Sequence, residues 1–322
     1  MTPPPRGNAA AQAAFTAALA SGSLHHAWLI AGPEGVGKAS FAKQAGAMLL
    51  GEDARHAPLI AANSHPDFKL IVREVWDTSK PPRIVPYGDR KVDEIPARSI
   101  RIAQIRSLLP ILGKAPALAS RRAIIIDSID DLEPPASNAL LKNLEEPPAS
   151  TTFLLVRHAP GRLLPTIRSR CRLLRFEALG DADMTAAVRD AQPEASAAEI
   201  DALVAAGEGS PGRALRYAGL DVAGLDAAIA GIAADGDPVN ARRVKLAKAL
   251  SGKAAHPRYE AVLERVPAFI ARAARDRRGA ALTAALDAHA AARDLAGAAV
   301  GLSLDPQATV YEMAGLVARL RG

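Results

Sequence analysis

Residues 27–40, AWLIAGPEGVGKAS, decide the fold. An apolar run at 27–31 predicts a buried strand, and a glycine-rich turn then leads into a helical pattern that begins at Lys38. The turn has the G-x-x-x-x-G-K spacing of a phosphate-binding loop, whose backbone N–H groups and lysine hold phosphate oxygens. The residues predicted to contact phosphate are Gly32, Pro33, Gly35, Val36, Gly37, Lys38 and Ala39.

Ala39 departs from this pattern, because the position after the lysine ordinarily carries a hydroxyl that binds Mg²⁺. Ser40 lies about 100° further around the helix and is not expected to replace that hydroxyl. Losing one polar contact to a charged group costs about 1.5–3 kcal/mol. The loop is therefore predicted to be poorly equipped to hold the metal of a nucleotide, although its backbone and Lys38 remain.

A second predicted strand ends in an acidic residue: Ile124–Asp127 has the form of the strand whose aspartate holds Mg²⁺ in nucleotide hydrolases. Asp127 is therefore a candidate nucleotide-site residue. Hydrolases of this type place a glutamate next, to activate water, but here Ser128 follows. Ala39 and Ser128 together predict a chain that is not an efficient ATPase by itself.

Strand and helix patterns alternate through the first half of the chain, which predicts an α/β fold with a doubly wound parallel sheet. The predicted strands are 27–31, 68–72, 121–130, 151–159 and 173–179, and the predicted helices are 9–21, 38–50, 98–112 and 134–145. In helix 98–112 the predicted buried side chains are Ile102, Ile105, Leu108 and Leu109. Residues 52–97 are predicted to form an irregular surface segment, and residues 1–8 a Pro- and Gly-rich leader.

After about residue 178 the strand patterns stop, and 221–322 is almost entirely helical in pattern. The formal net charge of +6 fits a protein that works near nucleic acid, but an arginine excess in an Ala-rich chain explains it equally. The single cysteine, Cys171, excludes an intrachain disulfide and a cysteine-based zinc site. No apolar stretch is long enough for a membrane span, so a cytoplasmic protein without a membrane partner is expected.

Several motifs together resemble those of the AAA+ clamp-loader subunits of bacterial DNA polymerase III. They are HHAWLIAGPEGVGK (25–38), SNALLKNLEEPP (137–148), TTFLL (151–155), LLPTIRSRC (163–171) and GSPGRAL (209–215). The resemblance covers about residues 20–215. It implies a RecA-like parallel-sheet domain at 1–178, a helical lid domain at 179–220 and an all-α collar domain for oligomerisation at 221–322.

The resemblance also implies roles for single residues. By position, Arg170 resembles the arginine finger that is directed at ATP in a neighbouring subunit, and Arg213 resembles the sensor-2 arginine of the lid. The motor subunits of the family have Thr where this chain has Ala39, and Glu where it has Ser128. They also have a Thr-rich segment where this chain has Arg157 and His158. These departures indicate a stationary subunit of the ring, not a motor.

The implied partners are the gamma/tau motor subunits, the delta subunit, the sliding clamp and, through the assembly, primed DNA. The implied cofactor is ATP or ADP with Mg²⁺, bound weakly or not at all. No zinc is expected, because the cysteines that many relatives carry are missing. Two alternatives stay open: an active AAA+ ATPase of the gamma/tau type, and a P-loop phosphotransferase, which the long helical C-terminus disfavours.

Overall fold

The computed structural model describes residues 5–51, 53, 55–76, 95–158 and 164–321. Parts of the predicted leader (1–4) and of the predicted surface segment (77–94) lie outside the described residues. No helix in the described ranges is both long and apolar enough to cross a bilayer.

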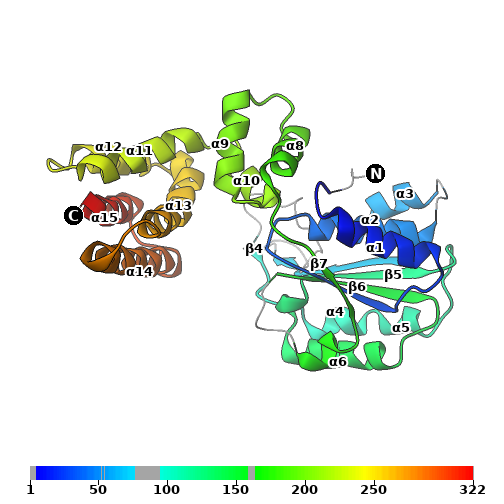
Figure 1. Ribbon diagram of the computed structural model, residues 1–322. Helices are drawn as coiled ribbons and strands as arrows, with labels where there is room; N and C mark the ends of the chain where they lie inside the picture. Colours follow the sequence, from blue (N-terminus) through cyan, green and yellow to red (C-terminus); the bar gives the residue numbers. More distant parts are fainter. Residues whose placement is uncertain (1–4, 52, 54, 77–94, 159–163, 322) are drawn as a thin grey trace. The chain divides into compact units, whose positions relative to one another are not determined.

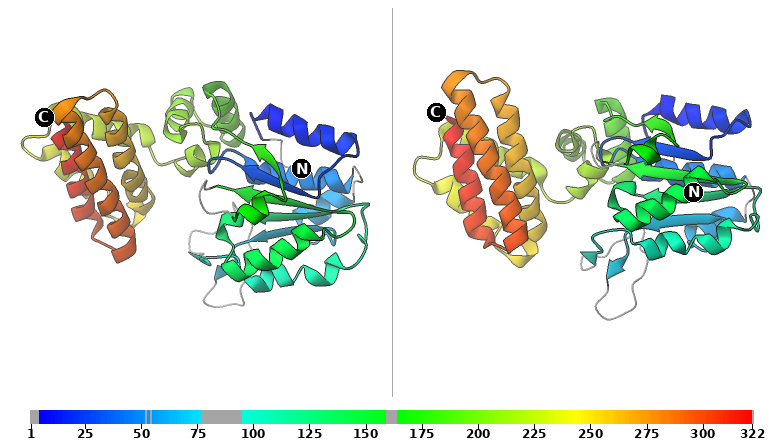
Figure 2. Two further views of the ribbon diagram at one scale, coloured as in Figure 1. Left: turned by 60° about the horizontal axis from the view of Figure 1, so that its bottom comes forward. Right: turned by 90° about the horizontal axis from the view of Figure 1, so that it is seen from below.

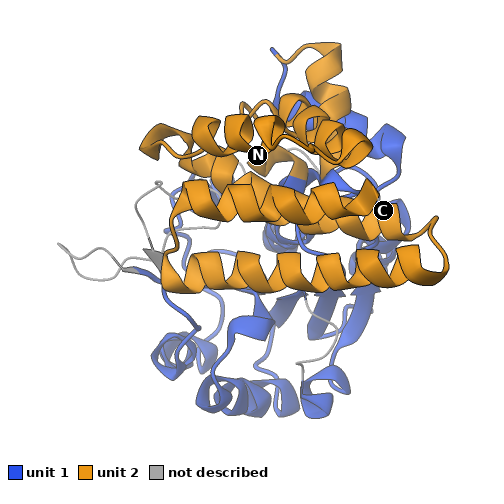
Figure 3. Cartoon of the chain, turned by 90° about the vertical axis from the view of Figure 1, so that its left-hand side faces the viewer, with its two compact units in different colours: residues 1–194, 207–213 blue, residues 195–206, 214–322 orange. Residues whose placement is uncertain are grey.

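The chain divides into two compact units (Figure 3). One unit comprises residues 1–194 and 207–213, and the other comprises residues 195–206 and 214–322. The residues of the predicted lid domain, 179–220, are thus shared between the two units. The three-domain division stays a prediction.

The first unit contains the predicted parallel sheet, which has five strands in the order β2-β5-β6-β1-β7. The strands are β1 (Ala27–Ala31), β2 (Phe68–Val72), β5 (Arg122–Asp127), β6 (Thr151–Arg157) and β7 (Arg172–Arg175). All four neighbouring pairs are parallel. The central strands are almost wholly apolar because helices cover both faces of the sheet. The α/β prediction is confirmed.

Helices α1, α2 and α3 lie on one face of the sheet, and α4, α5 and α6 lie on the other (Figure 1). Their bounds are α1 (Ala9–Ala20), α2 (Lys38–Leu50), α3 (His56–Ala61), α4 (Ile102–Arg106), α5 (Leu109–Leu112) and α6 (Pro134–Glu145). A 3-10 turn, η1 (Ile129–Asp131), joins β5 to α6, and two short helices follow β6 and β7, namely α7 (Pro165–Arg168) and α8 (Asp181–Ala191).

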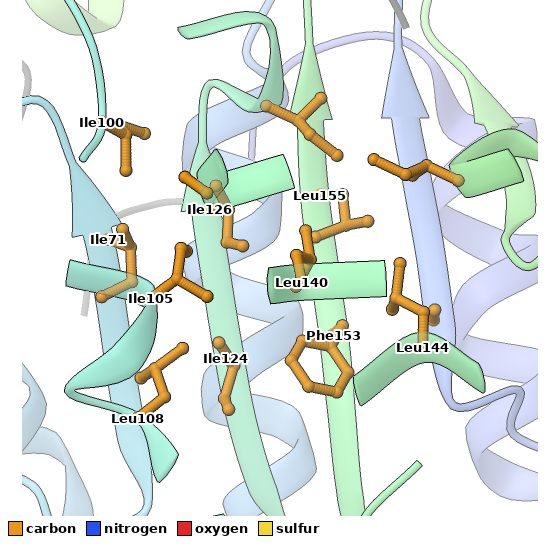
Figure 4. Close-up of a cluster of buried hydrophobic side chains, with 14 of the residues drawn as sticks. Ile71, Ile100, Ile105, Leu108, Ile124, Ile126, Leu140, Leu144, Phe153 and Leu155 are labelled. Atoms are coloured by element: carbon orange, nitrogen blue, oxygen red, sulfur yellow. The ribbon is translucent and has the colours of Figure 1, made fainter. Parts of the chain in front are cut away.

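One core fills the space between the sheet and α4–α6 (Figure 4). Ile124 and Ile126 of β5 and Phe153 and Leu155 of β6 point into it from the sheet. The helices contribute side chains that include Ile105, Leu108, Leu140 and Leu144. Each of these side chains is at most 2% exposed. This apolar layer fixes α6 against the strands.

The single helix predicted at 98–112 is wrong, because the chain forms two short helices, α4 and α5. Pro110 lacks the N–H that an uninterrupted helix would direct at the carbonyl of Arg106. The break turns Leu109 outward, and this residue is 54% exposed although it was predicted to be buried. Ile105 and Leu108 are buried as predicted.

The segment predicted as irregular contains α3 and a short antiparallel pair, β3 (Val75–Trp76) and β4 (Ile95–Pro96). A buried contact holds α3 to the residues before β2, where Nε2 of His65 lies 2.9 Å from Nδ1 of His56. The backbone N–H of Asp67 donates to Nδ1 of His65, so Nε2 of His65 carries the proton and donates to His56. This hydrogen bond between two imidazoles therefore joins α3 to the residues just before β2.

Among the described residues of the second unit, all regular elements are helices. Its elements are α9 (Ala197–Gly207), α10 (Pro211–Arg216), α11 (Val222–Asp235), α12 (Ala241–Ala249), η2 (Lys253–Ala255), α13 (His256–Ala274), α14 (Gly279–Leu302), α15 (Pro306–Ala318) and η3 (Arg319–Arg321), with α9 and α10 each running across the boundary between units. Helices α13, α14 and α15 lie side by side (Figure 2). The buried side chains of α14 are all alanines, which permits close helix packing.

Candidate functional site

The phosphate-loop motif connects β1 to α2 at the carboxyl edge of the sheet, meaning the edge where the parallel strands end. Glycine is required at two positions of the loop. A Cβ atom on Gly32 would lie 2.0 Å from the carbonyl oxygen of Phe176, and one on Gly35 would lie 2.3 Å from Oγ of Ser210. Val36 is buried beneath the loop. The loop therefore lies against the rest of its own chain.

Lys38 is turned back onto this loop. Its side chain is only 2% exposed, and Nζ donates to the carbonyl oxygen of Gly32 at 2.8 Å and to that of Pro33. Burial lowers the pKa of Lys38 to about 8, against the opposing attraction of Asp127, Glu34 and Asp130. The lysine thus satisfies carbonyls of the loop that surrounds it.

Further contacts come from the start of α10. Ser210 Oγ donates to the carbonyl oxygen of Glu34, and the backbone N–H of Gly212 donates to the carbonyl oxygen of Gly35, both at 2.8 Å. Next to them, a Cβ on Gly37 would lie 2.8 Å from Cβ of Pro5. Ser210 and Gly212 therefore cover Gly35, and Pro5 covers Gly37.

Asp127 ends β5 beside the loop, where burial raises its pKa against the attraction of Lys43 and Lys38. The ring of His158 approaches it, with Nε2 at 3.7 Å from Oδ1 of Asp127. Burial and the nearby Lys38 lower the pKa of this histidine. Asp127 therefore faces an imidazole and two ammonium groups.

Asp130, which was not among the predicted site residues, also belongs to this group of side chains. Its Oδ2 accepts the backbone N–H of His158 at 2.6 Å, and its Oδ1 lies 3.8 Å from Nε of Arg157. The parallel register of β5 and β6 places Asp127 beside Val156, so residues just after both strands meet at the carboxyl edge. Once β5 and β6 are known to be neighbours, this register identifies Asp130 and His158 as members of the site.

The side chains around Asp127 do not fit Mg²⁺. Position 39 offers no hydroxyl, and the charged groups near Asp127 are mainly cations (Lys38, Lys43 and Arg73), which with the imidazole of His158 outnumber the one nearby carboxylate, Asp131. Within the part of the chain that is described, no group of three or more His, Cys, Asp or Glu side chains could hold a metal ion. The absence of zinc remains a prediction.

The backbone of Arg213 lies next to the phosphate loop. Its N–H donates to Ser210 Oγ at 3.1 Å and would lie 3.1 Å from a Cβ on Gly35. Its guanidinium pairs with Glu208 at 2.8 Å. The sensor-2 role stays a prediction.

Arg170 lies elsewhere, at the amino edge of the sheet, where the parallel strands begin. It stands two residues before β7, whose first residue, Arg172, pairs with Trp28 near the start of β1. The phosphate loop follows the other end of β1, and five strand residues span about 15 Å. Arg170 and the chain's own phosphate loop are therefore at opposite edges of the sheet.

Two contacts hold the guanidinium of Arg170. Nη2 lies 2.8 Å from Oε1 of Glu145, at the end of α6, and Nη1 donates to the carbonyl oxygen of Thr166 at 2.8 Å. The flanking residues Ile167 and Cys171 belong to or pack against the same apolar core as Leu140 and Leu144 of α6. Burial raises the pKa of the Cys171 thiol to about 12, so it is a packing group and not a nucleophile.

Comparison with known families identifies a match to the model described as DNA polymerase III, delta subunit, over residues 7–180, which is more than half of the chain. A DNA polymerase III subunit delta' from Pseudomonas aeruginosa is 32% identical over 206 residues, covering 61% of this chain and 57% of that protein. The subunit tau of Salmonella typhimurium is 36% identical over 164 residues, covering 50% of this chain and 23% of that protein. The match therefore spans about half or less of these relatives.

Among solved structures, a DNA polymerase III gamma subunit-related protein from Thermotoga maritima matches 92% of this chain and 95% of that chain. Its sequence identity is 17% and its TM-score is 0.43.

Proposed function

Since the chain belongs to the DNA polymerase III delta subunit family, we propose that it is a stationary clamp-loader subunit of the delta-prime type. In this role it supplies Arg170 to the ATP site of a neighbouring motor subunit. The ring that it helps to form loads the sliding clamp onto primed DNA during replication. The proposed partners are gamma/tau-type motor subunits and a delta subunit, and the proposed location is the cytoplasm.

The position of Arg170 carries this proposal. An arginine at the amino edge of the sheet cannot reach phosphate at the loop after β1 of the same chain. It can reach a nucleotide only if that nucleotide belongs to another subunit. A guanidinium suits this task because its planar N–H groups pair with phosphate oxygens as negative charge develops in the transition state.

The chain's own phosphate loop has a different part in this proposal. Lys38 and the segment around Ser210 contact the loop, so ATP or ADP is expected to bind there weakly or not at all. Asp127 and Arg213 then keep the arrangement of a nucleotide site without serving hydrolysis. We further propose that 1–178, 179–220 and 221–322 correspond to a nucleotide-binding-like domain, a lid and a collar.

The test is ATP turnover by an assembly reconstituted from this chain, the motor subunits and delta, with clamp and primed DNA. Arg170→Ala is expected to silence the motor site that the chain serves, because such an arginine contributes on the order of 10³ or more at one site, so assembly turnover should fall by that site's share. The remaining turnover comes from motor sites that the chain does not serve. Arg168→Ala, an exposed arginine on α7, is the matched control and should leave turnover unchanged.

An active motor subunit is the second candidate, because the tau relative is 36% identical over 164 residues. This candidate predicts Mg²⁺-dependent ATP turnover by the purified chain alone, which Lys38→Ala abolishes. ATP turnover by the chain alone, together with wild-type ATP turnover by the assembly that contains Arg170→Ala, would overturn the proposed stationary role.

A further inference from the structure

We infer that Glu145 is a positioning residue for Arg170: it holds the guanidinium at the angle at which it meets a neighbouring nucleotide. This inference rests on the proposed function of Arg170. It adds a second residue from a different element, because Glu145 ends α6 whereas Arg170 follows α7.

The first argument is that both partners are fixed to one core. Leu140 and Leu144 bury one face of α6, and Ile167 and Cys171 pack the segment around Arg170 against the same cluster. The 2.8 Å distance between Glu145 Oε1 and Arg170 Nη2 is therefore set by core packing on both sides. A site works well when a packed scaffold restrains the groups that orient it.

The second argument is electrostatic. The last turn of a helix carries partial negative charge, so a carboxylate there is unfavourable and a cation is favoured. Glu145 nevertheless ends α6, and the guanidinium of Arg170 compensates its charge. The two side chains are 48% and 33% exposed, and a pair this exposed contributes little to stability. The placement of Glu145 is therefore better explained by orientation than by folding.

The third argument is the number of donors. A guanidinium has five N–H groups, so contacts of one nitrogen with Glu145 and of another with Thr166 leave donors for phosphate oxygens. The contacts restrict rotation of a long side chain before the neighbour arrives. Orientation established in advance lowers the activation barrier, whereas a misplacement of about 1 Å can cost up to about a hundredfold in rate.

The experiment measures kcat and KM for ATP in the same reconstituted assembly. Glu145→Ala should lower the part of kcat that depends on Arg170 about threefold, with KM for ATP unchanged, because the finger acts on the transition state. Glu145→Gln keeps an acceptor oxygen and should lose less. Glu146→Ala removes the adjacent exposed carboxylate and is the matched control. The unfolding temperature of each purified variant should equal that of wild type.

A double-mutant cycle separates positioning from any other role of Glu145. In the Arg170→Ala background, Glu145→Ala should cause no further loss of kcat, since no guanidinium remains to be oriented. A further loss in that background, or wild-type kcat for Glu145→Ala alone, would overturn the inference. If Arg170→Ala itself has no effect, the proposed function fails instead, so the two failures are distinguishable.

Discussion

At the scale of single residues, the burial of Lys38 against the phosphate loop predicts a pH dependence of stability that can be measured. Burial lowers its pKa from 10.5 to about 8, so between these values the folded chain binds fewer protons than the unfolded chain. The unfolding free energy therefore rises with pH across this window. Relative to Lys38→Met, wild type should gain about 2 kcal/mol between pH 7.5 and 10.

Urea unfolding of wild type and Lys38→Met at several pH values measures the difference between their unfolding free energies. The contributions of all other ionisable groups are the same in both proteins and cancel in this difference. Lys248→Met controls for the loss of a lysine at an exposed position of α12. A difference between wild type and Lys38→Met that stays constant with pH would mean that Nζ is not buried against the loop carbonyls.

At the scale of elements, the contact between the phosphate loop and the start of α10 depends on Ser210. Its hydroxyl donates to Glu34 and accepts from the N–H of Arg213, and the residue is only 7% exposed. Ser210→Ala is expected to lower the unfolding free energy of the first unit by about 1–3 kcal/mol, because the half-buried N–H of Arg213 loses its acceptor. Chemical denaturation measures the change.

Ser251→Ala is the control for this prediction. Ser251 also donates from its hydroxyl to a backbone carbonyl, that of Lys248, but it is exposed. Its replacement should change stability by less than about 0.5 kcal/mol. An equally small effect of Ser210→Ala would show that the loop and α10 do not depend on this hydroxyl.

The elements also separate what sequence could predict from what it could not. Strands β1 and β2 and helix α6 have the predicted bounds, because continuous apolar runs and a proline-initiated helix are local signals. The break between α4 and α5 also has a local signal, because Pro110 cannot continue a helix, but the single helix predicted at 98–112 did not take it into account. The contact of Ser210 with Glu34 joins residues 176 positions apart, and no periodicity encodes such a pair. His158 lies between these cases, because strand register places it near Asp127 only once the strand order is known.

At the scale of the whole molecule, each compact unit has an ion pair with a buried member: both partners are buried in the first unit, whereas in the second the arginine is buried and Asp226 is 37% exposed. In the first unit, the fully buried Asp67 accepts the N–H groups of residues 117–119 and lies 3.6 Å from Arg122. In the second unit, Arg265, whose side chain is 4% exposed, donates through Nε to Asp226 at 2.6 Å. Removing one partner of a fully buried pair costs about 3–5 kcal/mol, and removing the half-exposed Asp226 from Arg265 is expected to cost less.

These pairs test whether the units unfold independently, as separate buried cores predict. Calorimetry of the whole chain should resolve two transitions. Asp67→Ala should lower the temperature of one transition only, and Asp226→Ala should lower only the other, by several degrees each. The double variant should show both shifts at their single-variant sizes, since distant sites add. A single transition that both variants lower would mean that the cores unfold together, and the stability of the phosphate loop could then not be assigned to the first unit alone.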